Sequence, residues 1–140
     1  MMRPTRIKTT LVALVLGLAC GGCDNSLEQK LEGKWQLKEV RRQEGLVERV
    51  DTVWYNFQTS LFEYQLYVPA LDSMRNLYGY KTLLGADSLE LELISYFNTT
   101  QDFLPLTDWS APKRLFRIVE QRGDRLVLES DGKEYHFKKQ

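Results

Sequence analysis

The segment SLELELIS, residues 88–95, alternates leucine and polar residues with a period of two. Side chains of a β-strand point to opposite faces in turn, so this pattern predicts a strand with its leucines on a core and its glutamates in water. Glu90 and Glu92 are therefore interpreted as a solvated strand face and not as a catalytic pair of carboxylates. A strand of this kind is typical of an antiparallel sheet with one face exposed to solvent.

The same alternation recurs along most of the chain. Seven further segments carry it: KWQLKEV (34–40), DTVWYNFQ (51–58), LFEYQLYV (61–68), LYGYKTLL (77–84), RLFRIVEQ (114–121), RLVLES (125–130) and EYHFKK (134–139). Gly- or Asp-containing turns at 44–46, 85–88, 122–124 and 130–132 link several of these segments as hairpins do. We therefore expect an all-β fold, an antiparallel eight-stranded up-and-down barrel, with no helix beyond one short turn at 27–31.

Aromatic residues dominate the faces that should point into this barrel. The alternation predicts that Tyr55, Tyr64, Tyr78 and Tyr80 face inward. A buried tyrosine hydroxyl needs a hydrogen-bond partner, which makes these residues candidates for binding a ligand. The alternative is that they pack in a filled core with their hydroxyls at the rim. An eight-stranded barrel has room for either arrangement.

One connection is much longer than the others. Residues 96–113, YFNTTQDFLPLTDWSAPK, include Phe103 and Trp109, which a solvated loop does not need. Either the loop plugs the end of the barrel or it forms a lid over a cavity, and both residues are ligand-binding candidates in the second case. A ligand-binding barrel should contain a cavity of about 300 Å³ or more beneath this loop.

The N-terminus has the features of a secretory signal. Arg3, Arg6 and Lys8 precede an apolar run, and small residues follow it. Residues 9–22 would extend about 21 Å as a helix, too short for a hydrocarbon core about 30 Å thick. We predict a signal peptide at 1–22, a polar tether at 23–30 and one barrel domain at 31–140.

Both cysteines lie at the end of this signal, in LACGGCDN, residues 18–25. The segment resembles the lipobox of bacterial lipoproteins. That resemblance implies that Cys23 receives an acyl lipid such as palmitate and becomes the mature N-terminus, with Cys20 as the second choice. A zinc site is not expected, because four ligands are needed and His136 is the only histidine.

The composition of the mature chain argues against several classes of function. Three of the 19 basic residues lie in 1–22, so residues 23–140 carry 16 basic against 19 acidic residues. A slightly acidic chain without a basic patch is not expected to bind nucleic acid. The sequence has no phosphate-binding loop and no nucleophile motif, and His136 is predicted to point outward. We therefore expect no catalytic residues, no metal and no cofactor.

Gly33 precedes Trp35 by two positions in LEGKWQL, residues 31–37, at the start of the first predicted strand. Together with the eight-strand pattern, this resembles the G-x-W signature of lipocalins over residues 31–140. The resemblance implies that Gly33 and Trp35 belong to the closed bottom of the barrel. It also implies that a basic residue near the last strand, here Lys138 or Lys139, stacks on the indole. The chain looks like the compact, largely uncharacterised lipocalin-like lipoproteins of Gram-negative bacteria.

These observations give two expectations for function. The first is a lipoprotein anchored in the outer membrane of a Gram-negative cell envelope, whose barrel binds a small hydrophobic or amphipathic ligand. The alternative is a non-enzymatic interaction or structural lipoprotein with a filled barrel that docks an envelope protein. The expected partners are the membrane, through the N-terminal lipid, and either the ligand or the partner protein. Whether the protein faces the periplasm or the cell surface is left open.

Overall fold

The computed structural model describes residues 26–94 and 99–140, so the predicted signal peptide, Cys20 and Cys23 lie outside the described residues. Its helices are α1 (Leu27–Leu31), η1 (Pro69–Leu71), α2 (Thr99–Phe103) and η2 (Leu104–Leu106). Its strands are β1 (Gly33–Arg42), β2 (Val47–Arg49), β3 (Val53–Gln58), β4 (Leu61–Val68), β5 (Ser73–Leu83), β6 (Ser88–Leu93), β7 (Lys113–Arg122), β8 (Arg125–Ser130) and β9 (Lys133–Lys139). All eight predicted strands are present. The sequence pattern does not predict β2, because its three residues are all exposed and show no alternation.

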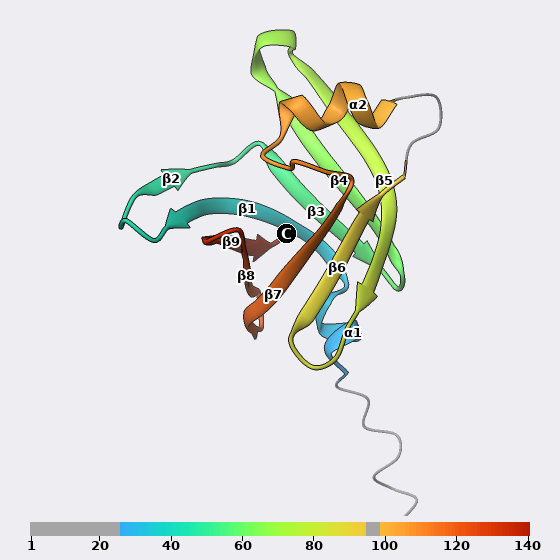
Figure 1. The fold of residues 1–140 in the computed structure, drawn as a ribbon, viewed down its shortest axis with the longest axis vertical. Helices are drawn as coiled ribbons and strands as arrows, with labels where there is room; N and C mark the ends of the chain where they lie inside the picture. The colour runs from blue at the N-terminus through green and yellow to red at the C-terminus, as the bar shows by residue number, and fades with distance from the viewer. Residues whose placement is uncertain (1–25, 95–98) are drawn as a thin grey trace, which may run out of the picture.

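The strands form a closed antiparallel meander, which confirms the predicted barrel. Neighbouring strands pair in the order β1-β3-β4-β5-β6-β7-β8-β9, and β9 pairs with β1 to close the sheet (Figure 1). Strand β1 pairs with β3 over residues 33–36 and with β2 over residues 39–41. A register shift against β9 between Leu37 and Glu39 marks the point where β1 changes partner. Closure leaves no free edge among the eight barrel strands.

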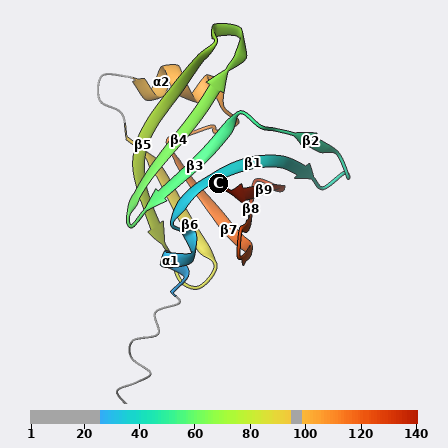
Figure 2. The same cartoon turned by 180° about the vertical axis from the view of Figure 1, so that it is seen from behind.

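The two ends of the barrel differ. Helix α1 lies at one end, which we call the bottom, and α2 lies across the opposite end, which we call the mouth (Figures 1 and 2). The β3–β4, β5–β6 and β7–β8 turns lie at the bottom, whereas the β4–β5 hairpin and residues 99–112 of the β6–β7 connection lie at the mouth. Residues 27–30, which the sequence assigned to a tether, form most of α1 and belong to the folded domain.

Aromatic rings fill the middle of the barrel. The ring centroid of Tyr55 lies 5.1 Å from Phe62, 5.0 Å from Tyr64 and 4.8 Å from Phe137. Tyr55 and Phe62 are almost fully buried, so these rings are packed against one another and not against solvent. Edge-to-face and tilted pairs at these separations are favourable beyond the area they bury. The barrel interior at this level is therefore a packed core.

The predicted face of β5 is wrong. Tyr78 and Tyr80 point outward, with 63% and 48% of their surface exposed, whereas Leu77 and Gly79 face the core. The partner strand imposes this choice, because Leu77 lies opposite Tyr64 and Gly79 lies opposite Phe62 in the β4–β5 register. Directly opposed residues share a face of a sheet.

Gly79 explains why the alternation predicts the wrong face of β5. A Cβ atom on Gly79 would lie 1.7 Å from the carbonyl oxygen of Glu92, so β5 and β6 approach too closely there for any side chain. The inward face of β5 carries Leu77, Gly79 and Lys81, so only one of its three buried residues has an apolar side chain. The sequence of this face therefore shows no apolar alternation.

No helix formed by residues 26–94 and 99–140 is long and apolar enough to cross a bilayer. Within the same residues, histidine, cysteine and carboxylate side chains do not gather into a group that could hold a metal ion.

Candidate functional site

The bottom of the barrel is closed by α1 and Trp35. Ser26 caps the helix, its hydroxyl oxygen accepting from the backbone N–H of Gln29 at 3.3 Å, and the helix ends at Leu31. Trp35 is fully buried, and its indole N–H donates to the carbonyl oxygen of Leu31 at 2.7 Å. The hydrogen bond uses a carbonyl that the end of a helix leaves unpaired. Helix and indole therefore form one unit across this end.

Lys139 supplies the basic partner of Trp35, one of the two lysines expected for it. Its ammonium lies 5.4 Å from the centroid of the indole, within the range of a cation–π contact. Gly33 has a φ of +120°, and a Cβ there would lie 2.8 Å from Cε of Lys139. Glycine at this position therefore allows both the strained backbone and the passage of the lysine over the ring.

A buried lysine lies among the aromatics near this end. Lys81 is 4% exposed, its ammonium lies 5.7 Å from the ring centroid of Phe57, and it has no hydrogen-bond partner among the described residues. Burial lowers the pKa of Lys81, and the carboxylates of Glu28 and Glu32 partly oppose that shift. The sequence pattern does not reveal this residue, because the apolar alternation places the other face of β5 on the core.

At the mouth, the long connection enters the barrel as a plug. Phe103 and Trp109 are 6% and 4% exposed. The Trp109 indole N–H donates to the hydroxyl of Tyr55 at 3.0 Å, and its ring stacks on Phe62 with centroids 6.0 Å apart and planes 8° apart. Of the two alternatives for this loop, its described part takes the first, because its aromatic residues fill space inside the strands.

Arg114 fixes this plug to the barrel wall. The side chain is 7% exposed and donates to the hydroxyl of Tyr135 at 2.6 Å, to Ser130 Oγ at 3.0 Å and to Asp108 of the plug at 3.2 Å. Tyr135 also donates its hydroxyl hydrogen to Asp108. The guanidinium carbon lies 4.8 Å from the ring centroid of Phe116. Cation, carboxylate and phenol therefore form one network, which we call the latch.

Burial and neighbouring charges act in opposite directions on the pKa of Arg114 in the latch. Burial lowers the pKa of Arg114, but Tyr135 and Asp108 raise it above its ordinary value, so the guanidinium stays charged. Burial and the hydrogen bond to Asp108 raise the pKa of the Tyr135 hydroxyl, which therefore stays protonated. The predicted site residues do not include Arg114. The available signal was its position two residues before Phe116, which places both on the same face of β7.

A hollow of about 200 Å³ remains at the mouth, between β1, β2, β3, β4, β9 and the plug. Its apolar walls include Leu37, Val40, Val53 and Leu66. The hollow is smaller than the cavity of about 300 Å³ expected for a ligand-binding barrel, because Trp109 occupies space inside the strands.

Polar groups surround the same hollow. Tyr64 lines it, and its hydroxyl makes no hydrogen bond to any described residue. Burial raises the pKa of Tyr64, so this hydroxyl is a neutral donor. Arg42 and Lys133 lie opposite each other at the ends of β1 and β9, and the Lys133 ammonium is 3.8 Å from Asp108. Glu48 and Asp108 also line the hollow, so it joins apolar walls and a donor to a rim that carries both signs of charge.

The structure separates the residues predicted for a ligand site. Four of them meet inside the barrel at the mouth end: Tyr55, Tyr64, Phe103 and Trp109. The hydroxyl of Tyr55 and the indole N–H of Trp109 already form a hydrogen bond with each other. Tyr78 and Tyr80 lie on the outer surface, so they cannot contribute to an interior site; the partner strand, not the local alternation, sets their direction.

The fold and its two ends define a class: an up-and-down β-barrel of eight strands, with one end closed by a helix and a tryptophan and a hollow at the other. The chain belongs to the lipocalin-like domain family, whose model matches residues 14–140. No curated protein matches this sequence.

Two crystal structures from Bacteroides resemble the barrel. One is of a lipocalin-like protein from Bacteroides uniformis, with 27% identity and a TM-score of 0.71. The other is of an uncharacterized protein from Bacteroides eggerthii, with 27% identity and a TM-score of 0.63. Each match covers 79% of this chain and 99% of the other. The shared architecture extends over the whole of those proteins, although a shared fold does not by itself assign a function.

Proposed function

We propose that the protein is a lipoprotein of a Gram-negative cell envelope, anchored in the outer membrane through Cys23, whose barrel binds a small amphipathic molecule at its mouth. The lipobox-like end of the signal segment supports the anchor, and the similarity to Bacteroides proteins supports a bacterial origin. The role of the barrel is non-enzymatic.

The observation that supports ligand binding is the hollow beside Tyr64. An apolar pocket with one unpaired hydroxyl and the guanidinium of Arg42 at its rim is suited to a short apolar chain that ends in a carboxylate. Arg42 makes no ion pair with any described residue, which leaves its guanidinium available to such a group. The volume of about 200 Å³ restricts the occupant to a small molecule or to part of a larger one.

Octanoate is expected to bind at the mouth, and a larger side chain that fills the hollow is expected to prevent this binding. Leu66→Trp should abolish binding because its ring would occupy the hollow, and Arg42→Gln should weaken binding about fivefold by removing an exposed cation. Isothermal titration calorimetry at low salt measures both effects.

Two neighbouring residues provide matched controls for this titration. Gln65→Trp adds the same ring to the outer face of β4, and Arg41→Gln removes an exposed cation that is paired with Glu39 at 2.8 Å. Both should bind octanoate like the unmodified protein, and all variants should give the same circular dichroism spectrum. Equal affinity of the Leu66→Trp and Gln65→Trp variants would exclude the hollow as the binding site.

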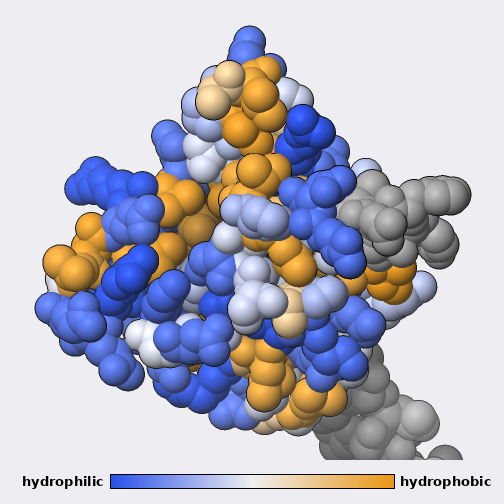
Figure 3. Space-filling view, turned by 45° about the horizontal axis from the view of Figure 1, so that its top comes forward, coloured by the Kyte–Doolittle hydropathy of each residue, from blue (hydrophilic) through white to orange (hydrophobic). Residues whose placement is uncertain are grey.

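The filled interior favours a second candidate, an interaction lipoprotein that docks an envelope protein. Three apolar side chains are exposed at the mouth end: Leu71 at 56%, Met74 at 45% and Leu106 at 45%. Figure 3 shows hydrophobic surface at the tip of the β4–β5 hairpin and near the centre of this view. Native mass spectrometry of protein taken from its own envelope separates the candidates, since one predicts a bound small molecule and the other a bound chain.

The anchor has its own test. Cys23→Ser is expected to move the protein from the membrane fraction to the soluble fraction, because a serine cannot accept the thioether-linked lipid and no other anchor is proposed. Cell fractionation followed by immunoblotting measures this shift, and Cys20→Ser is the matched control that should stay with the membrane. The reverse pattern would assign the lipid to Cys20.

A further inference from the structure

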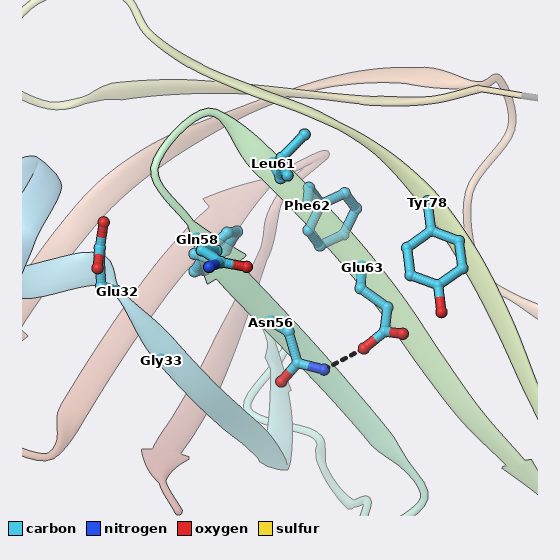
Figure 4. Close-up of a pocket in the computed structure, with 9 residues that line it drawn as sticks. Glu32, Gly33, Asn56, Gln58, Leu61, Phe62, Glu63 and Tyr78 are labelled. Atoms are coloured by element: carbon cyan, nitrogen blue, oxygen red, sulfur yellow. Dashed lines mark hydrogen bonds between the residues drawn. The ribbon is translucent and has the colours of Figure 1, made fainter.

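The outer surface carries a second hollow, separate from the mouth. It has a volume of about 480 Å³ and lies over β3, β4 and β5 beside the start of β1 (Figure 4). Its lining includes Glu32, Asn56, Gln58, Leu61, Glu63 and Tyr78. We call this the outer groove. It is larger than the hollow at the mouth, and the packed core does not fill it because it faces solvent.

Strand register brings three polar residues into a row along the groove. Asn56 lies opposite Glu63 in the β3–β4 pair, and Glu63 lies opposite Tyr78 in the β4–β5 pair. The Asn56 amide donates to Glu63 at 2.5 Å and to Gln65 at 3.1 Å. Figure 4 shows the Glu63 carboxylate between the Asn56 amide and the ring of Tyr78. The carboxylate is thus held in place before any ligand arrives.

The groove offers hydrogen-bond acceptors. Asn56 orients Glu63 but does not supply an acceptor itself, because its Oδ1 is buried. Glu63 accepts from Asn56 through one carboxylate oxygen, Oε1, and its interaction with the Tyr78 hydroxyl raises the pKa of that hydroxyl. Glu32 accepts from the backbone N–H of Thr59 at 3.0 Å, also through one oxygen. Each carboxylate therefore retains acceptor capacity, since an ionised carboxylate has about four lone-pair sites.

The charge of the groove has one sign. Glu32 and Glu63 line it, and no lysine or arginine is among its lining residues. The nearest cation along the row is Lys34, which lies opposite Asn56, but its ammonium is held 5.5 Å from the ring centroid of Trp54. A groove with two carboxylates and no basic lining residue attracts a cation.

An exposed aromatic ring completes the arrangement. Tyr78 is 63% exposed, and the neighbouring Leu61 and Tyr80, which pair with each other across β4 and β5, are 52% and 48% exposed. The face of a tyrosine ring attracts ammonium and guanidinium groups, and apolar neighbours can cover the methylene stem of a lysine or arginine.

We propose that the outer groove binds a lysine or arginine side chain on a basic peptide segment of a partner protein. Acceptors, negative charge and an exposed ring are the three features that such a side chain needs, and they occur together here. The outer groove shares no lining residue with the proposed ligand hollow, so this inference does not depend on that function.

The test uses the blocked pentapeptide acetyl-Gly-Arg-Gly-Arg-Gly-amide and the full folded domain, residues 26–140. The peptide should bind with chemical-shift changes centred on the Asn56 side-chain amide, and binding should weaken as salt rises from 50 to 500 mM. Replacing both arginines by citrulline keeps the shape but removes the charge, and should weaken binding at least tenfold. Glu63→Gln should weaken binding of the arginine peptide about tenfold.

Glu90→Gln is the matched control, because Glu90 is also on an outer strand face but lies beside Lys113, at 3.8 Å, and outside the groove. This variant should bind the peptide normally. Equal binding of the arginine and citrulline peptides, or equal loss in the Glu63 and Glu90 variants, would overturn the proposal. Binding of phosphatidylethanolamine vesicles without binding of the peptide would also overturn it, by assigning the cation to a lipid headgroup.

Discussion

Trp35→Ala is expected to lower the free energy of unfolding by about 3–5 kcal/mol, the range for removing a fully buried tryptophan. Trp35 is 0% exposed, closes the bottom of the barrel and donates to the Leu31 carbonyl, so the variant loses packing and leaves that carbonyl unpaired. Lys139 also loses the ring beneath its ammonium. Urea unfolding followed by circular dichroism measures the loss as a lower midpoint at an unchanged slope.

Trp54→Ala is the control for this prediction. Trp54 lies on the outer face of β3, is partly exposed and contacts Lys34 through its ring. Its removal should cost about 1 kcal/mol or less, as for a surface contact. A similar loss in both variants would show that the energy comes from aromatic area in general and not from closure of the bottom.

Arg114→Met is expected to lower the free energy of unfolding by about 2–3 kcal/mol. Removing one partner of a buried ion pair costs about 3–5 kcal/mol, because the other charge remains without compensation. The smaller figure applies here because Asp108 is 36% exposed and still has Lys133 at 3.8 Å. The same urea measurement applies, with Arg117→Met as the control.

Arg117 is on the same strand but on the outer face, where it pairs with Glu129 at 2.7 Å and is 52% exposed. Exposed pairs contribute about 0–1 kcal/mol, so Arg117→Met should change the midpoint little. A double-mutant cycle of Arg114→Met with Asp108→Asn should show coupling of about 1 kcal/mol or more, since the two side chains share one network. Additive effects would contradict the latch.

Local patterns predicted most of the fold. The alternation of leucine and glutamate at 88–95 reappears as β6, with Leu89, Leu91 and Leu93 buried. The Gly33–Trp35 spacing predicted a basic partner for the indole, and Lys139 occupies that position. Both predictions concern contacts that follow from the period of a strand or from the resemblance to lipocalins, so a single sequence was sufficient for them.

The candidate site was predicted less well. Tyr78 and Tyr80 were assigned to the interior because their alternation is locally more apolar than that of Leu77 and Gly79. The pairing of β5 with β4 decides the face, and a shift of one residue exchanges the two sets completely. The outer groove was missed for the same reason, since it depends on Tyr78 pointing outward.

The number of barrel strands, their turns and the tryptophan at the bottom are predictable from short segments, because each depends on residues close together in the chain. What fills the barrel depends on contacts between residues that are far apart in the chain. Trp109 meets Tyr55 across 54 positions, and Arg114 meets Tyr135 across 21, so neither contact leaves a local pattern. Polar side chains enter a core when distant partners satisfy them, and those partners become visible only when the barrel closes.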